Sequence, residues 1–359
     1  MMKLQIYFVV LILPLVWSTV CLAESESDEI TPGHHIEEGF RNYPIVEQNA
    51  RLGLSFYWKR FIASFSSPDV PDHHVLPKEE AISLYDALRN ENTITWIGQS
   101  TLLIKINGVV IVTDPYFAKL ASPLIVGPER FVPPGIAADE LPGVDVILLS
   151  HNHYDHLDEA FIEALPSRAQ TAVIVPLGMA MFFSERGYQH VHQLDWHDSV
   201  QVAGMQFTAL PAVHYSGRGR SDKNKTLWCA WAIATPAGHY YFLGDSAYSP
   251  TLFKETGKNF PAFDLAMVPI GTYGNRKYGV NNHTNPEEAV QLAKEINAKA
   301  VMGIHWGTID LSDEDPREPP LRFRSAAEAG GYRAEDVWLL KIGESRRLPQ
   351  KPEATTEDE

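Results

Sequence analysis

Residues 150–158 read Ser-His-Asn-His-Tyr-Asp-His-Leu-Asp and directly follow the apolar run Val-Asp-Val-Ile-Leu-Leu at 144–149. The run predicts a buried strand, so the polar stretch begins where this strand leaves its sheet. Imidazole and carboxylate groups are common ligands of zinc and related ions, and the spacing His-x-His-x-Asp-His lets two sets of ligands reach two ions. Such a dense cluster, in a chain with 14 histidines, favours a metal site over an ordinary polar loop. The candidate ligands here are His151, His153, Asp155 and His156.

Three more polar residues follow apolar β runs elsewhere in the chain. They are His214 after 206–210, Asp245 after 240–244 and His305 after 300–304. A polar side chain just past a buried strand needs a specific partner, so we expect these three to complete the metal site. The other histidines, His34 and His35 among them, lie in polar or irregular stretches and fit a ligand role less well.

Short β-type runs and helical stretches share the body of the chain. The early runs follow one another as in a meander, at 93–97, 101–106 and 109–112. The clearest helix is expected over 286–297, because Asn285 offers an N-cap and Pro286 suits the first helical position. This mixture favours an α/β sandwich over a purely parallel sheet, in a domain that spans residues 90–345.

The first 23 residues have the pattern of a signal peptide. Lys3 supplies a positive charge, residues 4–16 are almost all apolar, and Cys21-Leu22-Ala23 offers a cleavage site. We therefore predict an exported protein of the periplasm or envelope, with an uncleaved membrane anchor as the alternative. Cleavage leaves Cys229 as the sole cysteine, so no intramolecular disulfide is expected.

Two segments flank the predicted domain. Residues 24–89 form an N-terminal extension, in which 48–65 carries aromatic and apolar residues at helical spacing. This amphipathic helix either packs against the core or contacts a lipid surface. Residues 346–359 are acidic and small and predict a disordered tail. The formal charge of −15 argues against nucleic acid as a partner, because phosphate backbones repel an acidic chain.

Several motifs, which together cover roughly residues 90–325, carry a family resemblance. They read WIGQSTLLI, VTDPYF, ASPLIVGPERF, VILLSHNHYDHLD, PAVHYSGRGRSDKNKTLWCAW, YFLGDSAY, VPIGTYGNRKYGVNNHTNPEEAV and GIHWGTIDLSDEDPREPP. The chain resembles the metallo-β-lactamase superfamily and, within it, the phospholipases D that hydrolyse N-acylphosphatidylethanolamine. The resemblance implies an αββα sandwich with two zinc ions at one edge, and it implies a homodimer.

The resemblance also divides the ligands between the two ions. His151, His153 and His214 hold one zinc ion, Asp155, His156 and His305 hold the other, and Asp245 bridges both. Manganese or iron would also suit these ligands. Gln99 departs from the pattern, because relatives commonly have histidine there, so the contact that this loop makes with the site stays open.

This centre is expected to hydrolyse a phosphodiester. Two ions lower the pKa of a shared water, giving a metal-bridging hydroxide, and neutralise charge on phosphate oxygens. By resemblance the substrate is an N-acylphosphatidylethanolamine-type phospholipid at a membrane surface, cleaved to phosphatidate and N-acylethanolamine. Asp155 and Asp245 are the expected catalytic residues, Asp155 by orienting the hydroxide. The alternatives are a zinc hydrolase of another ester, a lactone or a small phosphodiester, and a non-catalytic envelope protein.

Four other residues are candidates for supporting roles. His283 precedes the capped helix and is expected either in the same cleft or at the surface. Arg218 begins a basic run that either guides an anionic head group or forms a solvated loop, and Tyr154 either shapes the pocket or packs at its rim. Asp158 is expected to orient a ligand histidine by a hydrogen bond.

Overall fold

The computed structural model describes residues 33–46, 58, 68–124, 126–219 and 221–349. The predicted signal peptide and, except for Trp58, the predicted helix at 48–65 lie outside these described residues. The N-terminal helical extension therefore stays a prediction. No helix in the described part of the chain is long and apolar enough to cross a membrane.

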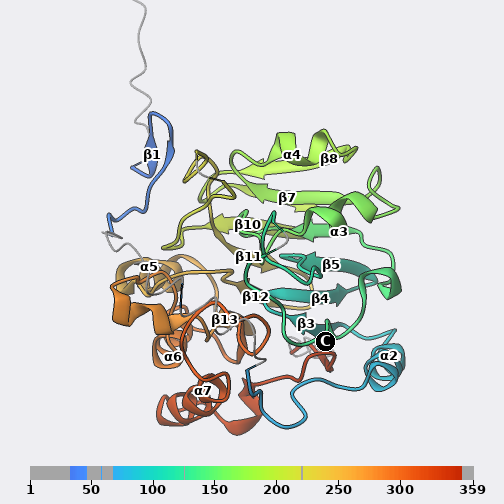
Figure 1. Ribbon diagram of the computed structural model, residues 1–359, viewed down its shortest axis with the longest axis vertical. Coiled ribbons are helices and arrows are strands. Elements are labelled where there is room, and N and C mark those ends of the chain that lie inside the picture. The colour runs from blue at the N-terminus through green and yellow to red at the C-terminus, as the bar shows by residue number, and fades with distance from the viewer. Residues whose placement is uncertain (1–32, 47–57, 59–67, 125, 220, 350–359) are drawn as a thin grey trace, which may run out of the picture. The chain divides into compact units, whose positions relative to one another are not determined.

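Two seven-stranded sheets form the body of the protein (Figure 1). In order across the sheet, the first contains β16 (Ser345–Arg347), β3 (Thr93–Gly98), β4 (Thr101–Ile106), β5 (Val109–Thr113), β6 (Val146–Leu148), β7 (Ala172–Pro176) and β8 (His190–Leu194). The second contains β15 (Val337–Trp338), β14 (Val301–Ile304), β13 (Leu265–Pro269), β12 (His239–Phe242), β11 (Ala230–Ala234), β10 (Met205–Leu210) and β9 (Ser199–Val202).

Both sheets mix antiparallel and parallel pairs. β3, β4 and β5 form an antiparallel meander, and β6, β7 and β8 then join in parallel. In the second sheet β9 to β12 are antiparallel, whereas β13, β14 and β15 add in parallel. The mixed α/β sandwich predicted from the sequence is thereby confirmed.

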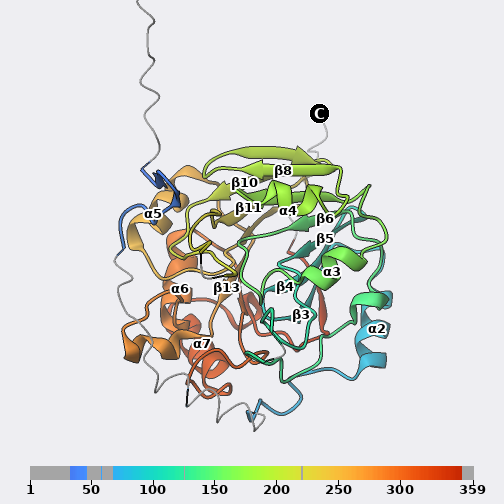
Figure 2. The ribbon, with the colours of Figure 1, turned by 45° about the horizontal axis from the view of Figure 1, so that its top comes forward.

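Helices cover the outer faces of the sheets. The first sheet is accompanied by α2 (Lys78–Ala87), α3 (Glu159–Ala164) and α4 (Ala180–Ser184), and the second by α5 (Pro250–Asn259), α6 (Pro286–Glu295) and α7 (Glu318–Ala329). Within the described ranges, the 3-10 helices are η1 (Ala138–Glu140), η2 (Tyr273–Tyr278) and η3 (Ala334–Asp336). In Figure 2, α5, α6 and α7 lie together on one side of this body, and α2 and α3 lie on the other.

The two main apolar cores of the described residues hold these layers together. The larger core joins the two sheets through residues such as Ile111 of β5 and Trp231 of β11, and it reaches Phe323 of α7. The smaller core contains Val112 of β5 and Phe161 of α3 on the outer face of the first sheet. Because successive side chains of a strand point to opposite faces, the neighbours Ile111 and Val112 enter different cores. A strand buried on both faces, as β5 is, reads as a continuous apolar run.

The start of α6 follows the capping signal in the sequence. The Asn285 side chain accepts a hydrogen bond from the Glu288 backbone at 2.8 Å, and the Glu288 carboxylate accepts one from the Asn285 backbone at 3.2 Å. Pro286 occupies the first turn, where its missing N–H costs nothing. This capping box fixes the chain that carries His283 just before the helix.

A short N-terminal hairpin packs onto the sandwich. It consists of β1 (His35–Ile36) and β2 (Gly39–Phe40), and the Phe40 side chain enters the larger core. The Phe40 backbone donates to the Asn224 carbonyl at 2.8 Å. At the other end of the chain, β16 includes Arg346 and Arg347 and Leu348 is buried, so the folded body continues past residue 345.

Candidate metal centre

The seven predicted ligands gather around one point, although they come from both sheets. His151, His153, Asp155 and His156 lie in the loop after β6, His214 follows β10, Asp245 follows β12 and His305 follows β14. Their donor atoms form two groups, each with all atoms within 4.8 Å of one another. These buried His/Asp clusters have the composition and proximity that a binuclear metal site requires.

The first group contains three histidines and one carboxylate. His153 Nδ1 lies 2.8 Å from His151 Nε2 and 3.3 Å from His214 Nε2. Asp245 Oδ2 lies 3.9 Å from His151 Nε2 and 3.7 Å from His214 Nε2. The four donor atoms therefore face one another across a space of the size of a metal ion.

The second group shares Asp245 with the first. Asp245 Oδ2 lies 3.1 Å from His156 Nε2, and Asp245 Oδ1 lies 3.3 Å from His305 Nε2. Asp155 Oδ2 completes the group at 3.3 Å from His305 Nε2 and 3.5 Å from His156 Nε2. Asp245 is the one residue common to the two groups, which is the position predicted for a bridging ligand.

Hydrogen bonds behind the histidines fix which ring nitrogen faces the centre. His156 Nδ1 contacts the Asp114 carboxylate at 2.7 Å and His214 Nδ1 contacts the Asn282 carbonyl at 3.0 Å, so each of these nitrogens carries the proton. The Ser150 hydroxyl donates its only proton to Asp114 and must accept from His151 Nδ1, 2.9 Å away. All three rings consequently direct Nε2 toward the centre.

The donor set fits a cation. The lone pairs of His151 Nε2 and His214 Nε2 both face His153 Nδ1, which has at most one proton to give while the rings are neutral. Asp245 Oδ1 and His283 Nδ1 are buried without a hydrogen-bond partner among the described residues. Buried lone pairs that converge without enough protons are stabilised when metal ions occupy the space between them.

Burial and charge set the protonation of these groups in opposite directions. Burial lowers the pKa of His214 to about 3 and that of His153 to about 4. Burial also acts to lower the pKa of His305, but neighbouring carboxylates, Asp245 foremost, raise it to about 9. For Asp245 burial acts to raise the pKa, yet His156 and His305 outweigh it and hold the pKa well below its usual range. His153 and His214 are thus neutral at pH 7, the form in which histidine binds metals.

Four residues at or beside the centre have a strained backbone. Gln99, Asp114, Thr272 and His305 all have positive φ angles, between 35° and 65°, a region that residues other than glycine rarely adopt. Gly244, just before Asp245, also has a positive φ, and a Cβ there would lie 2.4 Å from the Ser150 Cβ. Such strain persists only where surrounding contacts enforce it, and it is typical of functional sites.

Gln99 contacts two of the candidate ligands. Its Nε2 amide lies 2.9 Å from Asp155 Oδ2 and 2.8 Å from His305 Nε2, and its side chain is fully buried. Although Gln99 stands where relatives commonly have histidine, its loop still contacts the site, through the side-chain amide of Gln99. The sequence left this point open, because a polar residue between two apolar runs does not reveal its partners.

The prediction that Asp158 orients a ligand histidine is wrong. Its carboxylate accepts hydrogen bonds from the backbones of Ala160 and Phe161 as the N-cap of α3, and from the backbone of Phe117. Among the described residues it bonds no histidine, because the N-terminus of the helix takes its oxygens. Asp114 performs the predicted task instead, and sequence reasoning missed it. The signal was available, because Asp114 follows the apolar run of β5 just as the ligands follow theirs.

Three predicted supporting residues also lie near the centre. His283 is buried, and its Nδ1 lies 3.8 Å from Asp245 Oδ2. The Arg218 guanidinium stacks 3.9 Å over the Tyr154 ring and donates to the Asn152 and Leu157 carbonyls at 3.1 and 2.8 Å. Tyr154 in turn donates to the Arg218 carbonyl at 2.9 Å. Arg218 therefore braces the loop that carries the ligands, and a role in binding substrate stays a prediction for both residues.

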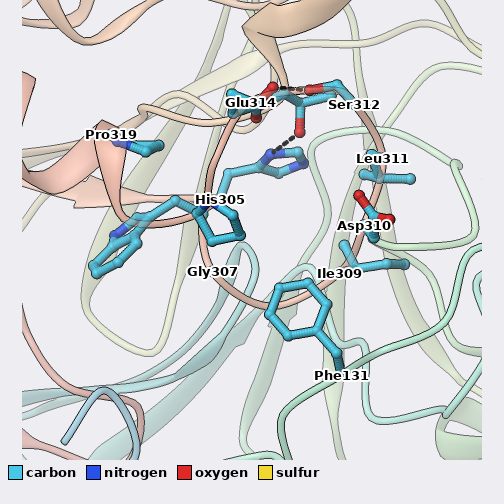
Figure 3. Close-up of a pocket in the computed structure, with 12 residues that line it drawn as sticks. Phe131, His305, Gly307, Ile309, Asp310, Leu311, Ser312, Glu314 and Pro319 are labelled. Atoms are coloured by element: carbon cyan, nitrogen blue, oxygen red, sulfur yellow. Dashed lines mark hydrogen bonds between the residues drawn. The ribbon is translucent and has the colours of Figure 1, made fainter. Parts of the chain in front are cut away.

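A small pocket opens beside His305 (Figure 3). Phe131, Ile309, Leu311 and Pro319 line it, and the Thr272 hydroxyl contacts His305 Nδ1 at 3.3 Å. Its volume of about 20 Å³ suits a water molecule and is too small for a lipid.

Comparison with known proteins defines the class. A family model described as "Beta-lactamase superfamily domain" matches residues 110–306. The chain belongs to the metallo-β-lactamase superfamily, and with its His/Asp clusters it is a metal-dependent hydrolase of that group.

Two relatives narrow the comparison. The N-acyl-phosphatidylethanolamine-hydrolyzing phospholipase D 1 of Caenorhabditis elegans is 33% identical over 329 residues, which cover 84% of this chain and 92% of that protein. The mitochondrial N-acyl-phosphatidylethanolamine-hydrolyzing phospholipase D of Saccharomyces cerevisiae is 35% identical over 245 residues, 67% of this chain and 52% of that protein. The resemblance predicted from the motifs is confirmed.

Solved structures show the same fold at low identity. An isothiocyanate hydrolase from Delia radicum gut bacteria has a TM-score of 0.57 at 17% identity and matches 72% of this chain and 100% of its own. CmlA, a diiron β-hydroxylase from Streptomyces venezuelae, has a TM-score of 0.55 at 18% identity and matches 72% of this chain and 54% of its own.

Proposed function

We propose that this protein is a two-zinc phosphodiesterase that hydrolyses N-acylphosphatidylethanolamine-type phospholipids to phosphatidate and N-acylethanolamine. The observation that carries the proposal is the pair of ligand groups joined at Asp245. The similarity to the phospholipases named above supports the choice of substrate.

In this proposal His151, His153 and His214 hold one ion, Asp155, His156 and His305 hold the other, and Asp245 joins them. Two such ions supply Lewis acidity, which lowers the pKa of water and neutralises charge on phosphoryl oxygens. Zinc is proposed by resemblance, since manganese and iron accept the same donors.

The remaining side chains prepare the centre. Asp114 and Ser150 hold His156 and His151 in the ring orientation that faces the ions. Gln99 orients the Asp155 carboxylate by donating to it, and Asp155 is thereby placed to accept a proton from an attacking water. His283 is proposed to contact the substrate phosphate from the side of Asp245.

Contact with a membrane surface is part of the proposal, because the substrate is a lipid. Exposed apolar side chains in the N-terminal part of the sequence support it: Tyr43 is 53% exposed, Ile45 67% and Trp58 63%. Large exposed apolar side chains lower their free energy by entering a lipid interface. Homodimer formation stays a proposal from the resemblance alone.

The test is mass spectrometry of lipids after zinc-loaded protein is mixed with N-acylphosphatidylethanolamine in micelles. We expect phosphatidate and N-acylethanolamine from the native protein and from the Asp139→Ala control, because Asp139 is exposed in η1. Asp245→Ala should abolish both products, because it removes the group shared by the two ions. Absence of product from protein that holds its metals would reject the substrate, and full activity of Asp245→Ala would reject the mechanism.

A further inference from the structure

A second cluster of metal-ligating side chains lies outside the centre described above. His34 and His35 come from the N-terminal hairpin, and Asp195 follows β8. His34 Nε2 lies 2.6 Å from Asp195 Oδ1, and His35 Nε2 lies 2.7 Å from Asp195 Oδ2. The three donor atoms lie within 4.8 Å of one another, and the proposed hydrolysis uses none of them.

Neighbouring aromatic rings hold the two imidazoles in place. The His34 ring stacks on the Trp196 ring with centroids 4.1 Å apart, and the His35 ring meets the Phe40 ring edge-on at 5.1 Å. Asp195 Oδ1 also accepts a hydrogen bond from the Trp196 backbone at 2.7 Å. Rings and carboxylate are therefore arranged in advance, so an ion would bind without first having to order them.

We propose that His34, His35 and Asp195 bind a further divalent ion of the zinc class, separate from the two-metal centre, and that this ion fastens the N-terminal hairpin to the loop after β8. Two imidazole nitrogens and one carboxylate oxygen form a familiar set of three zinc ligands, with water in the fourth position. The His35 and Asp195 side chains are 28% and 20% exposed, which leaves a path for the ion and room for that water.

The N-terminal hairpin connects this third ion to the two-metal centre. Just beyond β2, the Asn42 side chain donates to the His214 carbonyl at 3.0 Å and accepts from the His214 backbone N–H at 3.0 Å. These two bonds hold the backbone of a candidate ligand of the two-metal centre. An ion that fastens the hairpin therefore also stabilises the backbone position of His214.

The same three side chains also form a hydrogen-bonded latch without any ion, and the test separates the two possibilities. In the double variant His34→Gln/His35→Gln, the glutamine amides can still donate to Asp195, but they are poor zinc ligands. His190→Gln, on the exposed start of β8, is the matched control. Each full-length protein is loaded with Zn²⁺, freed of excess metal by gel filtration and analysed for zinc per chain.

We expect the double variant to hold one zinc ion per chain fewer than the native protein, and the control to hold as many as the native protein. Equal zinc content in all three proteins would overturn the proposal and leave the latch. If the double variant does not fold, His35→Gln alone gives the same readout, because His35 is the more exposed ring. The count needs no substrate, so its outcome is independent of whether the proposed hydrolysis is found.

Discussion

Replacing Asp114 with asparagine tests whether the site depends on the support behind its ligands. The Asp114 carboxylate is fully buried and accepts from the Ser150 backbone and hydroxyl, both at 2.6 Å, and from His156 Nδ1 at 2.7 Å. Burial raises the pKa of Asp114, and its contacts with His156 and Ser150 oppose that rise. Asparagine keeps one acceptor oxygen and places an NH₂ group where the other was, so at least one donor then faces another donor.

The size of the effect follows from those bonds. Each hydrogen bond to a charged group contributes about 1.5–3 kcal/mol, and a buried donor left without an acceptor costs about 1–3 kcal/mol. We therefore expect Asp114→Asn to lower the free energy of unfolding by about 2–3 kcal/mol. Since His156 and, through Ser150, His151 lose their fixed orientation, zinc affinity should fall about 10- to 100-fold.

The assay is a zinc titration against a competing chelator, together with urea unfolding of the metal-free protein. Asp158→Asn is the control, because asparagine caps a helix as well as aspartate does and Asp158 bonds only backbone groups of the described chain. Zinc affinity of the control should stay within about twofold of native. If Asp114→Asn binds zinc as tightly as the control does, the inference that Asp114 orients the ligands is refuted.

Three more predictions concern the centre and its support. Gln99→Leu removes the amide that contacts Asp155 and His305, and it should weaken zinc binding about tenfold, measured by the same titration. In the metal-free protein the pKa of His305 is raised to about 9, so below pH 9 zinc must displace its proton. As the pH is lowered from 9 to 7, the need to displace that proton should therefore reduce zinc affinity about tenfold for each pH unit, whereas above pH 9 this dependence should level off. A zinc affinity that does not change with pH would contradict the prediction. Asn42→Ala leaves the His214 backbone without two buried hydrogen bonds and should cost about 2 kcal/mol or more in denaturant unfolding.

The sequence predicted those features that depend on local pattern. Largely apolar runs marked the strands, because a strand buried on both faces has few polar positions, and β4 occupies the predicted residues 101–106. The capping signal at Asn285 and Pro286 placed the start of α6 correctly, because capping involves only residues three or four apart. Four candidate ligands were found as a dense cluster after the run 144–149, and the other three because a polar residue follows a buried run.

The features that the sequence did not predict depend on contacts between distant segments. Asp114 and Asp158 both look available to a histidine, and only the fold shows that α3 takes the oxygens of Asp158. Likewise, Asn42 reaches His214 across 172 positions, and His34 reaches Asp195 across 161. Hydrogen bonds of this kind leave no periodic signal, so a hairpin that reads as irregular and polar was given no part in the site.

Charge links the geometry of the centre to the proposed substrate. Asp155 and Asp245, which face the centre, have pKa values held well below the usual range, so they contribute two negative charges at neutral pH. Without metal, protons on His156 and His305 balance them, since the carboxylates raise the pKa of both rings against the effect of burial. Two divalent ions would replace those protons and, with the Asp114 carboxylate counted as well, would carry one positive charge more than the three carboxylates balance. In a chain whose formal charge is −15, such a local excess attracts an anion, which favours a phosphodiester over a neutral ester or lactone as the substrate.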